Sequence, residues 1–200
     1  MQNSATKIGF EQVTGRSCSP ALGKTFLKYV NEEVRANCMK MRDKAIDYIS
    51  KQPVDIVVLS SPFYFLESDY AAARKNLLKT VDVLRRTGKK VVIVSPVPMT
   101  GKDFGVCFKN ITFRNMPQNI CDSSKSKYSR RTKNTYKLLK SIEATVPIIW
   151  LDKFLCSGDV CSIIADGIPI YRDSGHLSKS GSAYLGRKYD IMGQILLLAK

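Results

Sequence analysis

The sequence predicts an α/β fold with a mostly parallel sheet and helices on both of its faces. Residues 55–61 and 89–96 are short, continuous apolar runs, which are typical of strands buried on both sides. Longer stretches with helical apolar spacing separate such runs, and strands that alternate with helices pair in parallel through right-handed crossovers. The 200 residues, 44% of them hydrophobic, suffice for one core, so we expect a single domain over residues 1–200.

The first third of the chain is expected to contain a strand, a long helix and a second strand. Residues 8–14 alternate loosely between apolar and polar side chains and end at Gly15, as a short strand does. Residues 21–49 carry apolar side chains at helical spacing, and Pro53 ends this helix. The apolar run 55–61 then follows as the second strand.

The middle of the chain continues this alternation. We expect a helix over residues 68–87 that stops at Gly88, followed by the strand 89–96. Residues 97–124 contain several Gly and Pro residues and are predicted to be irregular.

The last part is expected to add a helix over residues 125–145, a strand over residues 146–151 and a closing helix after Ser178. In parallel sheets of this kind, ligands and chemistry gather beyond the carboxyl ends of the strands. This rule points to four loops, at residues 14–18, 60–65, 95–99 and the loop that ends with Asp173 and His176.

The chain is strongly basic, with 32 Lys and Arg against 17 Asp and Glu and a formal net charge of +15. Such a surface favours an anionic neighbour, which can be nucleic acid, anionic lipid or acidic polysaccharide. The densest basic stretch, residues 125–137, includes Tyr128 and Tyr136, but no recognised nucleic-acid-binding module surrounds it. We therefore interpret this stretch as the solvent-exposed beginning of a helix, and we expect no nucleic-acid partner.

No apolar run in the sequence is long enough to cross a bilayer, because the best candidates stop after four or five residues. Residues 1–10 also lack the basic start and the apolar centre of a signal peptide. A location outside the cytoplasm would therefore need a targeting segment upstream of Met1.

The six cysteines fall into three neighbouring pairs, Cys18 with Cys38, Cys107 with Cys121, and Cys156 with Cys161. Six cysteines allow about fifteen connectivities, so this local pairing is a hypothesis. A zinc site is a weaker alternative, because Cys-x-x-Cys pairs are absent and the chain has a single histidine. Disulfides would place the domain in an oxidising compartment, and unpaired buried thiols in a cytosolic protein are the third possibility.

That histidine, His176, follows Asp173 by three residues at the entrance to the predicted closing helix. A carboxylate at this spacing can accept the imidazole Nδ1–H, fix the tautomer and leave Nε2 free to take a proton from a nucleophile. Taken alone the pattern is weak, since Asp173 can instead cap the helix and His176 can be an ordinary surface side chain.

The histidine belongs to a longer block, Tyr171-x-Asp-x-x-His-Leu-Ser-x-x-Gly181. Residues 88–98, residues 55–59, and residues 17–20 with Cys38 downstream are further characteristic segments. In this order they resemble the SGNH-hydrolase-like domain at the C-terminus of acyltransferase-3 membrane acyltransferases, which O-acetylate bacterial polysaccharides. The resemblance covers most of the chain and implies a three-layer α/β/α, flavodoxin-like fold.

This resemblance implies that His176 is a general base, that Asp173 orients it, and that Tyr171 and Leu177 pack the block in place. It implies structural disulfides in the periplasm, in agreement with the local pairing of the cysteines. The implied activity is a Ser-His-Asp acyl transfer, without cofactor or metal, to a sugar hydroxyl of a polysaccharide or lipopolysaccharide. The implied partner is an acyltransferase-3 transmembrane domain, at the periplasmic face of the bacterial inner membrane.

The nucleophile of this family is the serine of a Gly-Asp-Ser block directly after the first strand, and this chain contains no Gly-Asp-Ser. The nearest string, residues 157–160, has valine in place of the serine. Residues 1–7 resemble the tail of the family's first helix, so we expect the first strand and its serine upstream of Met1. The fold is thus expected to lack its first strand, and this chain alone to be inactive.

The other parts of the family's site are harder to place. Gly15 is the candidate for the glycine that donates to the oxyanion. The family also has an asparagine donor, but this chain has no asparagine at the end of the strand, where residues 60–64 stand. Backbone N–H groups would have to donate to the oxyanion in its place. Ser17, Ser60 and Ser61 are alternative hydroxyls, but they lack the sharp turn that exposes a nucleophile. Two other functions therefore stay open: an inactive glycan- or membrane-surface-binding domain, and a free-standing esterase.

Overall fold

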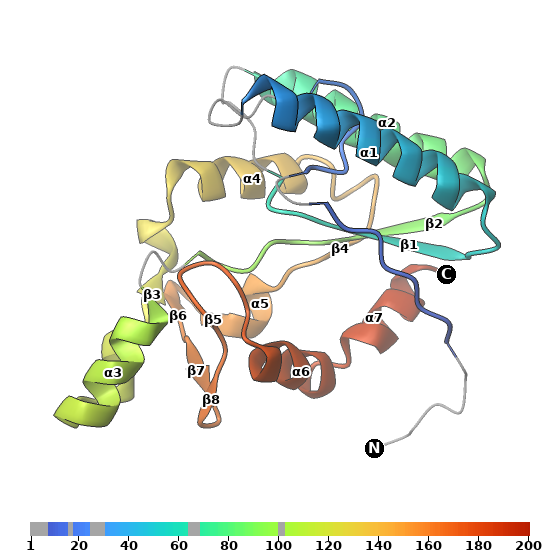
Figure 1. Cartoon of the computed structure of the whole chain (residues 1–200). Helices are drawn as coiled ribbons and strands as arrows, with labels where there is room; N and C mark the ends of the chain where they lie inside the picture. The colour runs from blue at the N-terminus through green and yellow to red at the C-terminus, as the bar shows by residue number, and fades with distance from the viewer. Residues whose placement is uncertain (1–7, 16–17, 25–30, 64–68, 100–102) are drawn as a thin grey trace.

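The computed structural model describes residues 8–15, 18–24, 31–63, 69–99 and 103–200 (Figure 1). Its centre is a parallel sheet with the strand order β1-β2-β4, and these strands are Ile56–Ser60, Lys90–Val94 and Ile148–Ile149. Val58 pairs with Val92, and Ile93 pairs with Ile148. The α/β class and the parallel pairing predicted from the sequence are confirmed.

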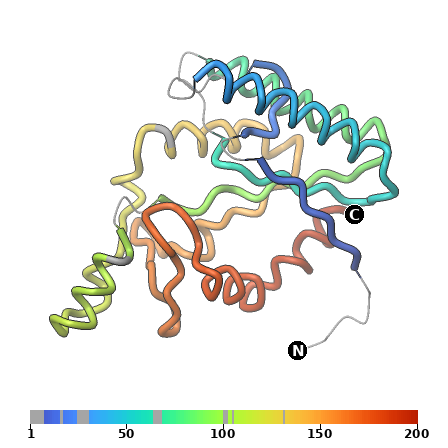
Figure 2. Tube along the Cα trace, viewed as in Figure 1, coloured from blue at the N-terminus to red at the C-terminus, as the bar shows by residue number. Residues whose placement is uncertain are grey.

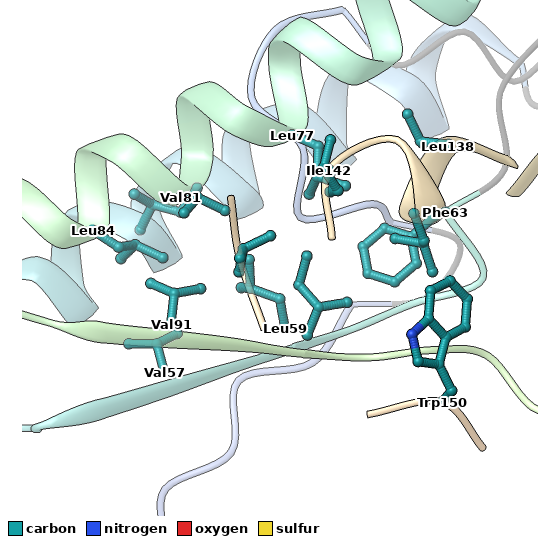
Figure 3. Close-up of a cluster of buried hydrophobic side chains, with 14 residues drawn as sticks. Val57, Leu59, Phe63, Leu77, Val81, Leu84, Val91, Leu138, Ile142 and Trp150 are labelled. Carbon is teal, nitrogen blue, oxygen red and sulfur yellow. The ribbon is translucent and has the colours of Figure 1, made fainter. Parts of the chain in front are cut away.

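One face of the sheet is covered by three helices, α1 (Glu32–Lys51), α2 (Tyr70–Arg86) and α4 (Arg130–Lys140) (Figure 1). Figure 3 shows the core beneath them, where Leu77 and Leu84 of α2 lie over Val57 and Val91 of the sheet. Full burial of such a side chain stabilises the fold by about 1.5–3 kcal/mol, so this layer supplies much of the hydrophobic stabilisation.

The opposite face of the sheet packs against α7 (Ile191–Leu198), where Val92 and Ile149 join Ile195 and Ala199 in one buried cluster. Successive residues of β2 therefore face opposite layers, as side chains in a strand must. This double burial explains why the strand is a continuous apolar run, and it completes the three-layer α/β/α arrangement.

Beyond the carboxyl ends of the strands lies a second group of elements, which we call the edge lobe, residues 103–127 and 152–178. Its helical segments are α3 (Phe104–Arg114), η2 (Gln118–Cys121), η3 (Lys125–Lys127) and α5 (Asp152–Leu155). Its strands are β3 (Ser123–Ser124), β5 (Cys156–Ser157), β6 (Val160–Cys161), β7 (Ile164–Ala165) and β8 (Ile168–Pro169), which form small antiparallel sheets. The helix α6 (Lys179–Lys188) packs against the lobe through Tyr184 and Leu185.

The strand predicted over residues 8–14 is wrong. These residues have no regular secondary structure, and Ile8, Phe10 and Val13 are exposed. A strand needs a neighbour to complete its backbone hydrogen bonds, and the described strands of this sheet pair only with one another.

The helix predicted over residues 21–49 starts later than expected, at the beginning of α1. Asn31 caps the helix there, and its side chain accepts the Val34 N–H at 2.8 Å. Residues 21–24 are not helical, and residues 25–30 lie outside the described part of the chain.

The helix predicted over residues 125–145 is also shorter than expected. Ser129 caps α4 by accepting the Thr132 N–H at 3.2 Å, and residues 141–146 are turns and bends. By contrast, α2 matches the prediction over residues 68–87, and Gly88 follows it with φ 81°, a left-handed conformation that ends many helices.

Two further helix boundaries differ from the prediction. Residues 97–124, expected to be irregular, contain α3, which Asp103 caps by accepting the Val106 N–H at 3.1 Å. The single closing helix is divided into α6 and α7 at Asp190, which has φ 43° and accepts the Gly193 N–H at 3.2 Å. Of the described helices, none is both long and apolar enough to cross a membrane.

Candidate functional site

The Asp173–His176 pair lies in a loop whose ends are joined by backbone hydrogen bonds. Tyr171 and Leu177 form an antiparallel bridge, and the Arg172 N–H donates to the His176 carbonyl at 2.8 Å. The Ser178 N–H donates to the carbonyl of Ile170 at 2.9 Å. The loop is therefore closed upon itself, and its conformation is fixed locally.

A buried tyrosine ties this loop to the carboxyl end of β2. The Tyr171 hydroxyl donates to the Pro98 carbonyl at 2.8 Å, and the side chain is almost fully buried. Burial raises the pKa of Tyr171, which keeps the phenol protonated and able to donate. Figure 2 shows the loop, in orange-red, on the same side of the molecule as the end of β2. The packing role implied for Tyr171 agrees with this contact.

The residues that follow the histidine fix the start of α6. Ser178 accepts the Gly181 N–H at 2.8 Å and donates to the Pro169 carbonyl at 2.6 Å. A Cβ atom at Gly181 would overlap the backbone of Ile170, so only glycine fits there. These contacts explain the Leu-Ser-x-x-Gly part of the sequence block as a structural support for the site.

Within the loop, the Asp173 carboxylate holds the imidazole of His176 in place. The Nδ1 atom lies 2.8 Å from Oδ1 and 2.9 Å from Oδ2 of Asp173. The same carboxylate accepts the backbone N–H groups of Gly175 and His176, at 3.0 and 2.9 Å. The His176 side chain is 72% exposed, so its ring is accessible from solvent.

These donors also determine the charge of the carboxylate. The Gly175 N–H, together with the side chain and backbone N–H of His176, holds the pKa of Asp173 well below its usual range, although desolvation opposes the shift. Arg172, which sequence reasoning did not single out, adds Nε and Nη2 contacts of 3.3 Å to Oδ2. Asp173 is thus ionised at neutral pH and is a permanent acceptor for the histidine.

An ionised carboxylate on Nδ1 selects the tautomer that carries a proton there and leaves a lone pair on Nε2. Such an imidazole can accept a proton from a hydroxyl, and the carboxylate stabilises the imidazolium that forms. The pair therefore has the geometry of the base and the orienting acid of a catalytic triad. The roles of general base for His176 and of orienting acid for Asp173 stay predictions.

The third member of a triad, the nucleophile, is not joined to this pair. In the part of the chain that the structure describes, no hydroxyl makes a hydrogen bond to the His176 ring. Ser60 is the last residue of β1 and Ser61 accepts the Phe63 N–H at 3.2 Å, whereas the helix α2 begins only at Tyr70, so neither serine stands directly at the start of that helix. Ser17 falls outside the described residues.

Gly15, the candidate oxyanion donor, packs beside α1. A Cβ atom at Gly15 would overlap the thioether end of the Met41 side chain, which is flexible and could move aside. No described contact links Gly15 to the loop of Asp173 and His176. Its oxyanion role stays a prediction.

The three local disulfides are present in the structure, with Cα–Cα distances of 5.3 Å for Cys18–Cys38, 5.8 Å for Cys107–Cys121 and 3.9 Å for Cys156–Cys161. The local pairing hypothesis is confirmed, and the cysteines are not available as zinc ligands. Among the described residues, no group of three or more His, Cys, Asp or Glu side chains converges on a common point.

Comparison with solved structures finds the periplasmic domain of the lipopolysaccharide acetyltransferase of Salmonella ser. Paratyphi A, with a TM-score of 0.66 and 16% sequence identity. The match covers 90% of this chain and 69% of that one, and it shows a shared fold. Among curated protein sequences, no match reaches significance. The model of the SGNH domain that is fused to AT3 domains matches residues 3–190, and the chain therefore belongs to this family.

Proposed function

We propose that this chain is the SGNH domain of a polysaccharide or lipopolysaccharide O-acetyltransferase, acting in the periplasm beside an acyltransferase-3 transmembrane domain. The observation that carries the proposal is the Asp173–His176 pair, held at the carboxyl edge of the sheet in a member of this family. The structural neighbour, named as an acetyltransferase of lipopolysaccharide, and three disulfides suited to an oxidising compartment support it.

In the proposed reaction, Nε2 of His176 takes the proton of a serine hydroxyl while the serine oxygen bonds to the carbonyl carbon of the acyl donor. The tetrahedral intermediate expels the donor's leaving group, which receives that proton from His176. In the second half, His176 takes a proton from the sugar hydroxyl, whose oxygen attacks the acyl-serine, and returns it to the serine. Asp173 keeps the imidazole oriented and stabilises its charged form in both halves.

The serine, by this proposal, belongs to a Gly-Asp-Ser segment that precedes Met1 in a longer protein. Two observations support this placement: the His176 ring has no hydroxyl partner among the described residues, and β1 is hydrogen-bonded on one side by β2 with no described strand on its other edge. Ser60 and Ser61 lack a contact to the histidine, and this favours a serine from elsewhere.

The test measures hydrolysis of an activated acetyl ester by two proteins, the 200-residue chain and the same chain extended upstream through the Gly-Asp-Ser segment. We expect turnover from the extended protein only. His176→Ala and Asp173→Asn should each lower kcat by about 10⁴-fold, because the serine then lacks a correctly oriented base. Lys179→Gln, an exposed charge change next to the site, is the matched control and should retain full activity.

The other outcomes identify the alternatives. Turnover by the 200-residue chain that disappears in Ser60→Ala or Ser61→Ala would indicate a free-standing esterase. An inactive extended protein that still binds glycan after His176→Ala would indicate a binding domain built on an SGNH scaffold.

A further inference from the structure

The helix α3 carries apolar side chains on two opposite faces. On one face, Phe104 and Ile111 pack into the buried cluster of the edge lobe. On the other face, Val106 and Phe113 are 62% and 79% exposed. A helix at the surface of a soluble domain normally carries polar side chains opposite its buried face, so an apolar outer face indicates a contact surface.

This outer face belongs to a helix that is fixed at both of its sides. The Cys107–Cys121 disulfide joins α3 to η2, and the Asp103 side chain caps the start of the helix by accepting the Val106 N–H. Because Val106 and Phe113 are two turns apart, they lie on the same side of the helix, about 10 Å from each other along its axis. Figure 1 shows α3 projecting at one end of the molecule, away from the parallel sheet. The exposed apolar face is therefore a property of the folded domain.

The charged side chains of this segment are basic. Residues 104–121 contain Lys109 and Arg114 and no acidic residue. Lys109 is exposed and lies within about one turn of both Val106 and Phe113, and Arg114 is exposed in the last turn of the helix. Apolar side chains next to cations, without a carboxylate that would repel phosphate groups, suit the headgroup region of an anionic bilayer.

The net charge of the chain favours a membrane over a second copy of the chain as the partner of this face. A second copy would bring a further net charge of +15, and the repulsion between like charges opposes that contact. An anionic bilayer attracts the same charge and offers an apolar environment to Val106 and Phe113. The proposed function also places the domain beside a transmembrane partner, and in this respect the choice of a membrane rests on the proposed function.

The helix α3 and the histidine loop are linked through the core of the edge lobe. Phe104 of α3 and Tyr171 belong to the same buried cluster, and the Tyr171 hydroxyl joins the loop of Asp173 and His176 to the Pro98 carbonyl. A bilayer that bound α3 would therefore hold the edge lobe, together with the His176 loop, at the membrane surface.

We propose that α3 docks the domain on an anionic membrane surface. Val106 and Phe113 enter the boundary between the headgroups and the acyl chains, and the helix lies along the surface because both side chains are on one side of it. Lys109 and Arg114 contact lipid phosphates. This docking requires no catalytic step, so it can be measured separately from acyl transfer.

The experiment measures binding of the 200-residue chain to sedimented lipid vesicles. One set of vesicles is pure phosphatidylcholine, and the other contains equal parts of phosphatidylcholine and anionic phosphatidylglycerol. We expect at least about tenfold tighter binding to the anionic vesicles, weakened by added salt, because the attraction between charges is screened.

Phe113→Ser tests the apolar contact without changing the charge of the protein. It should weaken binding to the anionic vesicles by about tenfold, because the aromatic ring no longer leaves water. Phe10→Ser is the matched control, since Phe10 is 80% exposed and its segment, residues 8–15, lies far from α3 in Figure 1. The Phe10 variant should bind as the wild type does.

Lys109→Gln tests the contribution of charge at the same face. It should weaken binding by about fivefold, the loss expected for one basic residue near an anionic membrane. Lys44→Gln, the same charge change at an exposed position of α1, should have a smaller effect.

Insertion of the helix face is measured directly by fluorescence. The indole introduced by Phe113→Trp should be quenched by lipids that carry bromine on their acyl chains, whereas the indole introduced by Phe10→Trp should not. The native Trp150 is 7% exposed and gives the same background in both variants.

Equal binding by Phe113→Ser and Phe10→Ser would show that charge alone attracts the protein, and it would overturn the proposal. Equal affinity for the two kinds of vesicle would overturn it as well. Self-association without vesicles that Phe113→Ser abolishes would assign the face to a second copy, and vesicle binding that fails altogether would leave a protein partner as its occupant.

These outcomes are separable from those for the proposed function. An extended protein that is inactive but binds vesicles through Phe113 would reject the proposed function and retain the docking surface. An active extended protein whose Phe113→Ser variant binds vesicles as the wild type does would retain the proposed function and reject the docking surface.

Discussion

The parallel sheet and the edge lobe of this domain are held together by different means. In the sheet, strands of up to five residues and helices on both faces bury side chains completely, as for Leu84 on one face and Val92 on the other. In the edge lobe the strands are two residues long, and the Cys107–Cys121 and Cys156–Cys161 disulfides join neighbouring segments. The lobe also has a buried apolar cluster that includes Ile163 and Ile170, and the disulfides add covalent links to it.

This difference shows how the fold separates stability from the site. The His176 loop belongs to the lobe, yet Tyr171 fastens it to the end of β2 in the sheet. Functional residues concentrate on loops that a rigid scaffold positions, because the sequence of a loop can change with little loss of core stability. A change in one region is therefore expected to stay largely within that region.

The largest effect is expected in the sheet region. Leu84→Ala removes a side chain that is 0% exposed beneath α2, and it should lower the free energy of unfolding by about 2–5 kcal/mol because a cavity remains. Chemical denaturation measures the loss. Val58→Ala, on the same sheet but 42% exposed, is the control and should lose much less. Equal losses in the two variants would contradict the description of this region as the stabilising core.

Removal of a disulfide from the edge lobe should have the next largest effect. Cys107 and Cys121 are 14 residues apart, so the double Cys→Ser variant should lose about 3 kcal/mol through the greater freedom of the unfolded chain. The Cys156–Cys161 link spans 5 residues, and its loss should reach about 2 kcal/mol. Denaturation gives both values.

Amide hydrogen exchange then shows which helices and strands lose protection when a disulfide is removed. In the Cys107 and Cys121 variant, exchange should become faster in α3 and η2 while β1 and β2 keep their protection. Faster exchange throughout the sheet would mean that the sheet and the edge lobe unfold as one unit and are not stabilised separately.

Sequence reasoning succeeded where one physical signal dominates. Burial on both faces made residues 89–96 recognisable as a strand, and local spacing was sufficient to pair Cys156 with Cys161. It failed for residues 8–14, because an alternating pattern does not reveal whether a neighbouring strand is present. The strands of the lobe escaped detection because two residues carry no periodicity.

The candidate site was predictable in part for a similar reason. Asp173 and His176 are three residues apart, and a turn brings them together whatever surrounds it. The contact of Arg172 with Asp173 follows from adjacency and could have been expected.

A smaller effect should come from the bond that joins the two regions. Tyr171→Phe removes the donor to the buried Pro98 carbonyl without changing the packing of the ring, and it should lower stability by about 1 kcal/mol. Tyr189→Phe, which removes a bond to the Phe154 carbonyl away from the histidine, is the control. We expect faster exchange of the His176 amide only in Tyr171→Phe. The same change in both variants would show that Tyr171 has no special role in holding the loop.

The smallest effect concerns the charge of the site itself. The pKa of Asp173 is below its usual range in the folded protein because the Gly175 N–H and His176 stabilise the ionised form. Its contribution to stability is therefore fully present above the ordinary pKa of 3.8, and it is lost as the pH falls below that value through the lowered pKa. Solvent screening keeps the effect small, because the side chain is 36% exposed.

The measurement is the difference in unfolding free energy between the wild type and Asp173→Asn, taken at neutral pH and at several values below pH 3.8. The difference should shrink on acidification, because the wild-type carboxylate loses its charge while the amide does not titrate. Asp82→Asn, an exposed carboxylate on α2 paired with Arg86, corrects for the change in net charge. A difference that stays constant with pH would mean that the loop is held by its backbone and by Tyr171 alone. In that case the aspartate would contact the histidine without stabilising the fold, and the edge lobe would depend on the sheet even for the conformation of the loop that contains His176.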